Sequence, residues 1–65
     1  MRDPARIDRL VELLRAVWNA HPDWRLGQLI MNVNPNGHSD PFHIPDDQWE
    51  RALRAEVPQE ARDGG

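Results

Sequence analysis

The chain has 65 residues, no cysteine, and 8 Lys or Arg against 11 Asp or Glu, which gives a net charge of −3. A chain of this length predicts one domain, and its acidic balance argues against a basic surface that binds nucleic acid non-specifically. No apolar run approaches the ~18 residues of a membrane span, and the charged N-terminal segment does not resemble a signal peptide. Because the absence of cysteine fits a reducing compartment, we expect a cytoplasmic protein.

The first predicted helix covers residues 4–20. Asp3 followed by Pro4 is typical of a helix start, and Pro22 disfavours helical backbone just before it. Apolar residues recur at helical spacing: Ile7, Leu10, Val11, Leu14, Val17 and Trp18. We expect all six to face the core, with Leu13 left outside this stripe.

A second helix is predicted over residues 24–33, with Asp23 as its N-cap. Its apolar residues again follow the helical period: Leu26, Leu29, Ile30 and Val33. Gly27 lies inside this segment and weakens it by about 1 kcal/mol relative to alanine. The two helices would form a helix–turn–helix pair.

Residues 34–45 lose the helical period. The favoured interpretation is an ordered loop in which Phe42 and Ile44 point the same way, into the core. Asn36-Gly37 is also a strong hairpin signal, so a β-hairpin that pairs this segment with the end of the preceding one is the alternative.

The third predicted helix covers residues 46–56. Asp46 and Asp47 place negative charge at its start, where the helix dipole is positive. Two pairs of an acid followed four residues later by a base would support this helix: Asp47–Arg51 and Glu50–Arg54. Three apolar residues would face the core: Trp49, Ala52 and Leu53. The sequence therefore predicts an all-α fold: a small three-helix domain over residues 1–57, followed by a disordered tail at 58–65.

The two tryptophans Trp18 and Trp49 are predicted to be largely buried and to join the first helix to the third. Each lies on the apolar stripe of its own helix. A tryptophan buries a large apolar area, which a domain of this size needs, because its core contributes only a few kcal/mol of net stability.

The residues that could carry chemistry do not form a recognised pattern. His38, Asp40 and His43, with His21 elsewhere, match no established zinc spacing and are interpreted as solvated loop residues. Neighbouring acids at the start of the third helix are explained by capping, and no glycine-rich phosphate loop is present. We therefore expect no metal, no cofactor and no enzymatic activity.

A candidate partner-binding surface lies on the second helix. Arg25, Gln28 and Asn32 fall at i, i+3 and i+7 beside the apolar stripe, and Trp24 precedes them. A tryptophan next to an arginine suits a protein interface, which predicts a non-enzymatic module that binds another protein. The equally weighted alternative for Trp24 is a lid on the core that folds back over the end of the first helix. One alternative is a helix-turn-helix regulator that reads nucleic acid with these side chains; the other is an ordinary solvated face. A homo-oligomer is also compatible with the sequence.

Three stretches carry a family resemblance: Met1-Arg2-Asp3-Pro4-x-Arg6-Ile7, Pro22-Asp23-x-Arg25-Leu26-Gly27-Gln28-Leu29-Ile30, and Asp40-Pro41-Phe42 with Asp46-Asp47. Over about residues 1 to 53 the chain resembles a family of short bacterial and phage-borne proteins that have no assigned activity. The resemblance implies an intracellular protein that stands alone, and it assigns no functional residue.

Overall fold

The computed structural model describes residues 3–58. Along this part of the chain lie three α-helices and a short 3-10 helix: α1 (Ala5–Ala20), α2 (Leu26–Val33), η1 (Pro41–His43) and α3 (Asp46–Glu56). These residues contain no strand, so the all-α prediction is confirmed and the hairpin alternative is wrong. Within the same residues, no helix combines the length and apolar character needed to cross a membrane.

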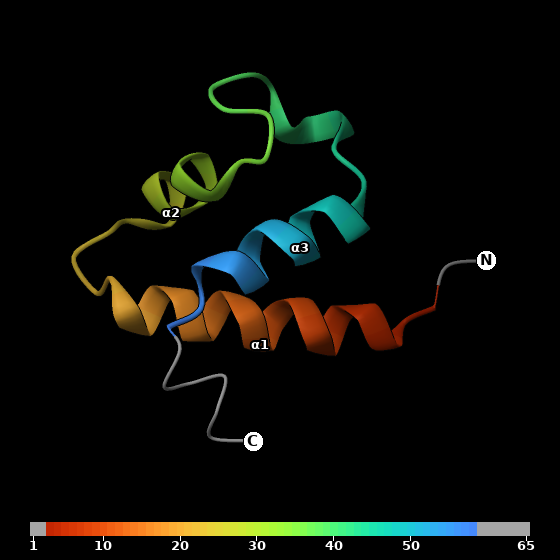
Figure 1. The fold of residues 1–65 in the computed structure, drawn as a ribbon, viewed down its shortest axis with the longest axis horizontal. Helices are drawn as coiled ribbons and strands as arrows, with labels where there is room; N and C mark the ends of the chain where they lie inside the picture. The colour runs from red at the N-terminus through yellow and green to blue at the C-terminus, as the bar shows by residue number, and fades with distance from the viewer. Residues whose placement is uncertain (1–2, 59–65) are drawn as a thin grey trace.

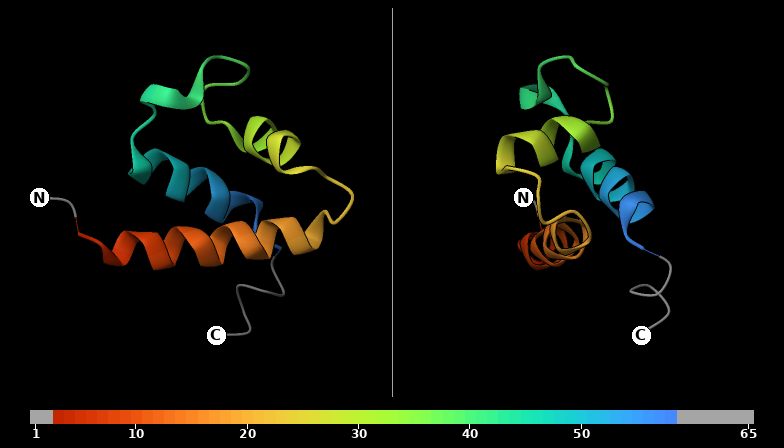
Figure 2. Two further views of the ribbon diagram at one scale, coloured as in Figure 1. Left: turned by 180° about the vertical axis from the view of Figure 1, so that it is seen from behind. Right: turned by 90° about the vertical axis from the view of Figure 1, so that its left-hand side faces the viewer.

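The long helix α1 forms the base of the fold (Figure 1). Helix α3 packs along α1 and also contacts α2. When α1 is viewed close to end-on, α2 and α3 both lie on the same side of it (Figure 2, right). Helices α1 and α3 run parallel, since their N-terminal residues Arg6 and Asp46 lie together and Arg9 and Glu50 follow one turn later.

The hydrophobic core lies where the three helices meet. Its buried residues are Val17 from α1, Leu29 and Val33 from α2, and Leu53 and Val57 from α3 and its C-terminal end. Half-buried side chains surround them: Leu10, Leu13, Leu14, Ala16, Trp24, Ile30, Trp49 and Ala52. Each fully buried aliphatic side chain contributes roughly 1.5–3 kcal/mol, so five of them supply much of what holds this small domain together.

Local signals start two of the helices. Pro4, not the predicted Asp3, is the N-cap of α1, and the Asp3 carboxylate just before it accepts a hydrogen bond from the Ala5 N–H at 3.0 Å. The prediction for α2 was wrong at its first residues: Arg25, not Asp23, is the N-cap. Its backbone N–H donates to Gln28 Oε1 at 2.8 Å, and the residues before it form a turn.

The loop between α2 and η1 is organised by Asn34, a buried polar residue. Its Nδ2 donates to the Ser39 carbonyl at 2.8 Å, and its Oδ1 accepts from the Asn36 N–H at 2.9 Å. Gly37 takes a positive φ of 71°, which side-chain-bearing residues rarely adopt. The Asn-Gly signal therefore marks a tight turn inside an ordered loop.

Two predictions of buried aromatic residues need correction. Phe42 was expected in the core together with Ile44, but only Ile44 is buried, while Phe42 is 81% exposed and contacts the His43 ring edge-on. Trp49 packs against the core, whereas Trp18 is 37% exposed. The short η1 helix explains the first case, because consecutive helical residues point in different directions. The predicted tail lies outside the described residues, apart from Pro58.

Ion pairs fasten α1 to α3 on one flank. Arg6 Nε lies 2.7 Å from Asp46 Oδ2, and Arg9 Nε lies 3.4 Å from Glu50 Oε1. Glu50 also accepts from Arg54 at 2.7 Å, one of the two predicted i, i+4 pairs. The pKa of the Glu50 carboxyl lies below its ordinary value, chiefly because of the hydrogen bond from Arg54; desolvation opposes this shift, and Arg9 lowers the pKa further.

Candidate protein-binding surfaces

The predicted binding residues of α2 reach the surface. Arg25, Gln28 and Asn32 are all exposed. The Gln28 side chain, however, is held by the N–H of Arg25, so part of its hydrogen-bonding capacity is used inside the helix. Arg25 remains the one cation of this group.

Trp24, the fourth predicted binding residue, contacts the core, whereas the other three are exposed. It is half-buried against the core, and its ring stacks on His21 with centroids 3.9 Å apart and planes 5° from parallel. Its carbonyl accepts a hydrogen bond of 2.8 Å from Trp18 Nε1. Trp24 therefore acts as a lid that ties the turn before α2 to the end of α1.

Within the described part of the chain, three of the five exposed large hydrophobic side chains lie on α1, and the other two are Leu26 and Phe42. Ile7, Val11, Leu14 and Trp18, which we call the α1 strip, fall at i, i+4, i+7 and i+11 and so share one face of the helix. Leu14 is half-buried, but Ile7 is 52%, Val11 47% and Trp18 37% exposed. Neighbouring large hydrophobic side chains left exposed in this way mark an interaction site more often than an ordinary surface.

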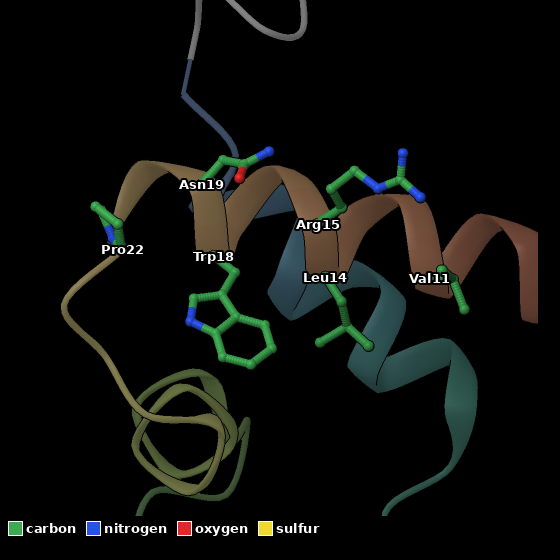
Figure 3. A pocket seen from close by; sticks show the side chains of 6 residues that line it. All are labelled: Val11, Leu14, Arg15, Trp18, Asn19 and Pro22. Carbon is green, nitrogen blue, oxygen red and sulfur yellow. The ribbon is translucent and has the colours of Figure 1, made fainter.

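The α1 strip borders a hollow of about 620 Å³. It is lined by Val11, Leu14, Arg15, Trp18, Asn19 and Pro22. Figure 3 shows Leu14 and Trp18 extending together from one side of α1, with Arg15 and Asn19 along the opposite edge. The hollow thus has an apolar floor and a polar rim, which is the usual composition of a protein interface.

The charges next to the strip are not used inside the domain. Among residues 3–58, four arginines form ion pairs with carboxylates: Arg6, Arg9, Arg51 and Arg54. Arg15 and Arg25 form none there. Asp8 likewise has no ion pair in this part of the chain, and by helical spacing it lies with Arg15 along one edge of the α1 strip.

Sequence reasoning missed this surface because it assigned the whole apolar stripe of α1 to the core. At 100° per residue the six stripe residues and Leu13 together span about 160° of the helix. The fold packs Leu10, Leu13, Leu14, Ala16 and Val17 against the core and leaves Ile7, Val11 and part of Trp18 exposed. Leu13, which the sequence pattern left outside the stripe, packs against the core. The excess width of the apolar face was the signal that a second surface existed.

The residues considered for metal binding or catalysis have structural contacts. Across residues 3–58, no group of three His, Cys, Asp or Glu side chains lies close enough to hold a metal ion. Asp40 caps η1 by accepting from the Phe42 N–H at 2.9 Å. Ser39 Oγ donates to the Asn36 carbonyl at 3.0 Å. The α1 strip is suited to binding an apolar surface.

Comparison with family models, with curated proteins and with solved structures finds no match to this chain. The resemblance to short bacterial and phage-borne proteins stays a prediction.

Proposed function

We propose that the protein is a small, non-enzymatic interaction module of the cytoplasm, an adaptor, regulator or inhibitor that binds another protein through the α1 strip. The occupant it suits is an amphipathic helix, laid along α1 with its apolar side against the strip. The observation that carries the proposal is the exposure of Ile7, Val11 and Trp18 on one face of a helix whose other face builds the core.

The physical argument concerns apolar area. Leaving large aliphatic and aromatic side chains in water forgoes roughly 25 cal/mol for each Å² that could be buried. A helix partner recovers that free energy, and helices recognise such grooves through side chains at i, i+3, i+4 and i+7. Trp18 adds the kind of anchor that dominates binding energy at interfaces, and it lines the hollow that would receive a partner side chain.

The α2 residues supply less to a binding site. Gln28 is engaged in the start of α2, and Trp24 closes the core. For a nucleic-acid-binding alternative, Arg25 is the single cation of the predicted group, whereas phosphate binding draws on several. The α2 group is therefore kept as a second contact for a protein partner.

The proposal can be tested with a displayed library of amphipathic helical peptides, selected against the protein. Binders should be lost with Val11→Asp and retained with Arg25→Ala, since only the first change places a charge on the strip. Binders lost with Arg25→Ala alone would move the site to α2. Failure to select any peptide whose binding depends on Val11 would contradict the proposal.

A further inference from the structure

The spacing of the α1 strip is that of a coiled-coil seam. Ile7, Val11, Leu14 and Trp18 alternate steps of four and three residues, which makes them consecutive d, a, d and a positions of a heptad repeat. The seam occupies α1 for two heptads and is continuous over the length of the helix. A surface of this kind is complementary to another helix that carries the same spacing.

The charges beside the seam specify the direction of that helix. Asp8 and Arg15 both fall at the e position, one heptad apart, and neither has an ion pair within residues 3–58. In an antiparallel pair of helices, e positions face e positions. Two copies of α1 packed antiparallel therefore place Asp8 of each copy beside Arg15 of the other, which gives two opposite-charge contacts.

We propose that the occupant of the α1 strip is a second copy of this chain, packed antiparallel about a two-fold axis that passes between positions 12 and 13 of α1. This inference rests on the proposed function, because it names the partner of the same surface. A two-fold interface requires a self-complementary patch, and the seam together with Asp8 and Arg15 is one.

Each core layer of this dimer pairs a larger side chain with a smaller one. About the two-fold axis, Ile7 of one copy is level with Trp18 of the other, and Val11 is level with Leu14. The hollow beside Trp18 then receives Ile7 of the second copy. Knobs of one helix entering holes of the facing helix are the packing that stabilises such pairs.

A parallel pair fits less well. In parallel coiled coils, e positions face g positions of the partner, and extending the heptad back past the first residue of α1, Ala5, places Asp3 at the g position before Asp8. The parallel arrangement would bring Asp3 and Asp8 of different copies together and leave Arg15 facing Leu10. Like charges at this spacing are unfavourable, so the charge pattern selects the antiparallel dimer.

The test uses sedimentation equilibrium of the full chain from about 10 μM to about 1 mM, the range in which a small apolar seam is expected to associate. Asp8→Arg and Arg15→Asp each convert both opposite-charge contacts into like-charge contacts, so each variant alone should dimerise about tenfold more weakly than wild type. An equimolar mixture of the two should form a heterodimer at wild-type strength. The matched control, Glu12→Arg, makes the same change of charge on the side of α1 away from the strip and should dimerise like wild type.

Each other outcome contradicts the inference in a distinct way. A wild-type protein that stays monomeric over the whole range overturns the dimer but leaves the proposed function standing if helical peptides still bind the strip. A dimer strengthened by Asp8→Arg would be parallel. A dimer that survives both charge reversals, or is lost equally with Glu12→Arg, uses another surface. Circular dichroism of each variant shows that α1 is still formed, and recovery in the mixture excludes misfolding as the cause.

Discussion

The two apolar faces of α1 have similar composition and different roles. On one face, Leu10, Leu13 and Val17 pack against the core, and Arg6 and Arg9 on the same flank are paired to carboxylates of α3. On the other face, Ile7, Val11 and Trp18 of the α1 strip are 52%, 47% and 37% exposed while Leu14 packs against the core, and the charges beside the strip have no ion pair within the described residues. The apolar side chains of α1 thus indicate that both faces are to be buried. The arrangement of the neighbouring helices decides whether a face is buried inside the domain or against a partner.

The difference follows from the size of the domain. Helices α2 and α3 approach α1 from the same side, so together they cover only part of its circumference (Figure 2). A larger bundle would place a further helix against the part of α1 that α2 and α3 leave uncovered. In this chain the remaining apolar face is available for association.

The largest loss of stability is expected from a charge placed on the face of α1 that packs against the core. Val17 is fully buried, so Val17→Asp would bury an unpaired carboxylate at a cost of several kcal/mol, comparable to the whole stability of a domain this small. The variant should lack a cooperative thermal transition followed by circular dichroism. A melting temperature like that of wild type would show that α1 does not pack on this face.

Trp18 belongs to the α1 strip but also contacts the turn before α2, so its substitution should lower the stability by an intermediate amount. Trp18→Phe keeps an aromatic ring on the strip but removes the hydrogen bond from Trp18 Nε1 to the Trp24 carbonyl, at a cost of about 1 kcal/mol. The free energy of unfolding, measured in urea, checks this value. A loss above about 3 kcal/mol would instead support the largely buried position of Trp18 that the sequence pattern predicts.

The Glu50 carboxylate makes a smaller, pH-dependent contribution to the stability of the fold, on the flank where α1 meets α3. Because the folded pKa of Glu50 is lowered by Arg54 and Arg9, its stabilising contribution is complete above the unfolded glutamate pKa of about 4.5 and is lost as the pH falls through the folded value. The melting temperature of Glu50→Gln should be below that of wild type at pH 7, and the two should converge near pH 3. A difference that does not change with pH would contradict the ion-pair account. Glu12→Gln, a matched change on the outer side of α1, should show little of this convergence.

Local chemistry made most of the fold predictable. Asp3, Pro4 and Pro22 mark the ends of α1, and the helical period identifies all three helices, because these signals act within a few residues. The start of α2 was missed, since the stacking of Trp24 on His21 holds the preceding residues in a turn. Such a contact between side chains is not visible in an apolar pattern.

The candidate site was harder to predict, for a physical reason. The exposure of the α1 strip depends on the directions from which α2 and α3 approach, which are set by tertiary packing and not by α1 itself. The burial of Asn34 depends in the same way on the path of a whole loop. The predicted exposure of Arg25 was correct, because a polar side chain beside an apolar stripe faces solvent wherever that stripe packs.

The most direct test of the account is Val11→Asp, the counterpart of Val17→Asp on the other face of the same helix. Valine and aspartate have similar helix propensities, so only the environment of the side chain distinguishes the two positions. Measured on dilute protein, the free energy of unfolding of Val11→Asp should stay within about 0.5 kcal/mol of wild type, while sedimentation at high concentration should show that self-association is lost. If Val11→Asp unfolds the isolated domain as Val17→Asp does, the α1 strip is part of the core, and the proposed binding surface is wrong.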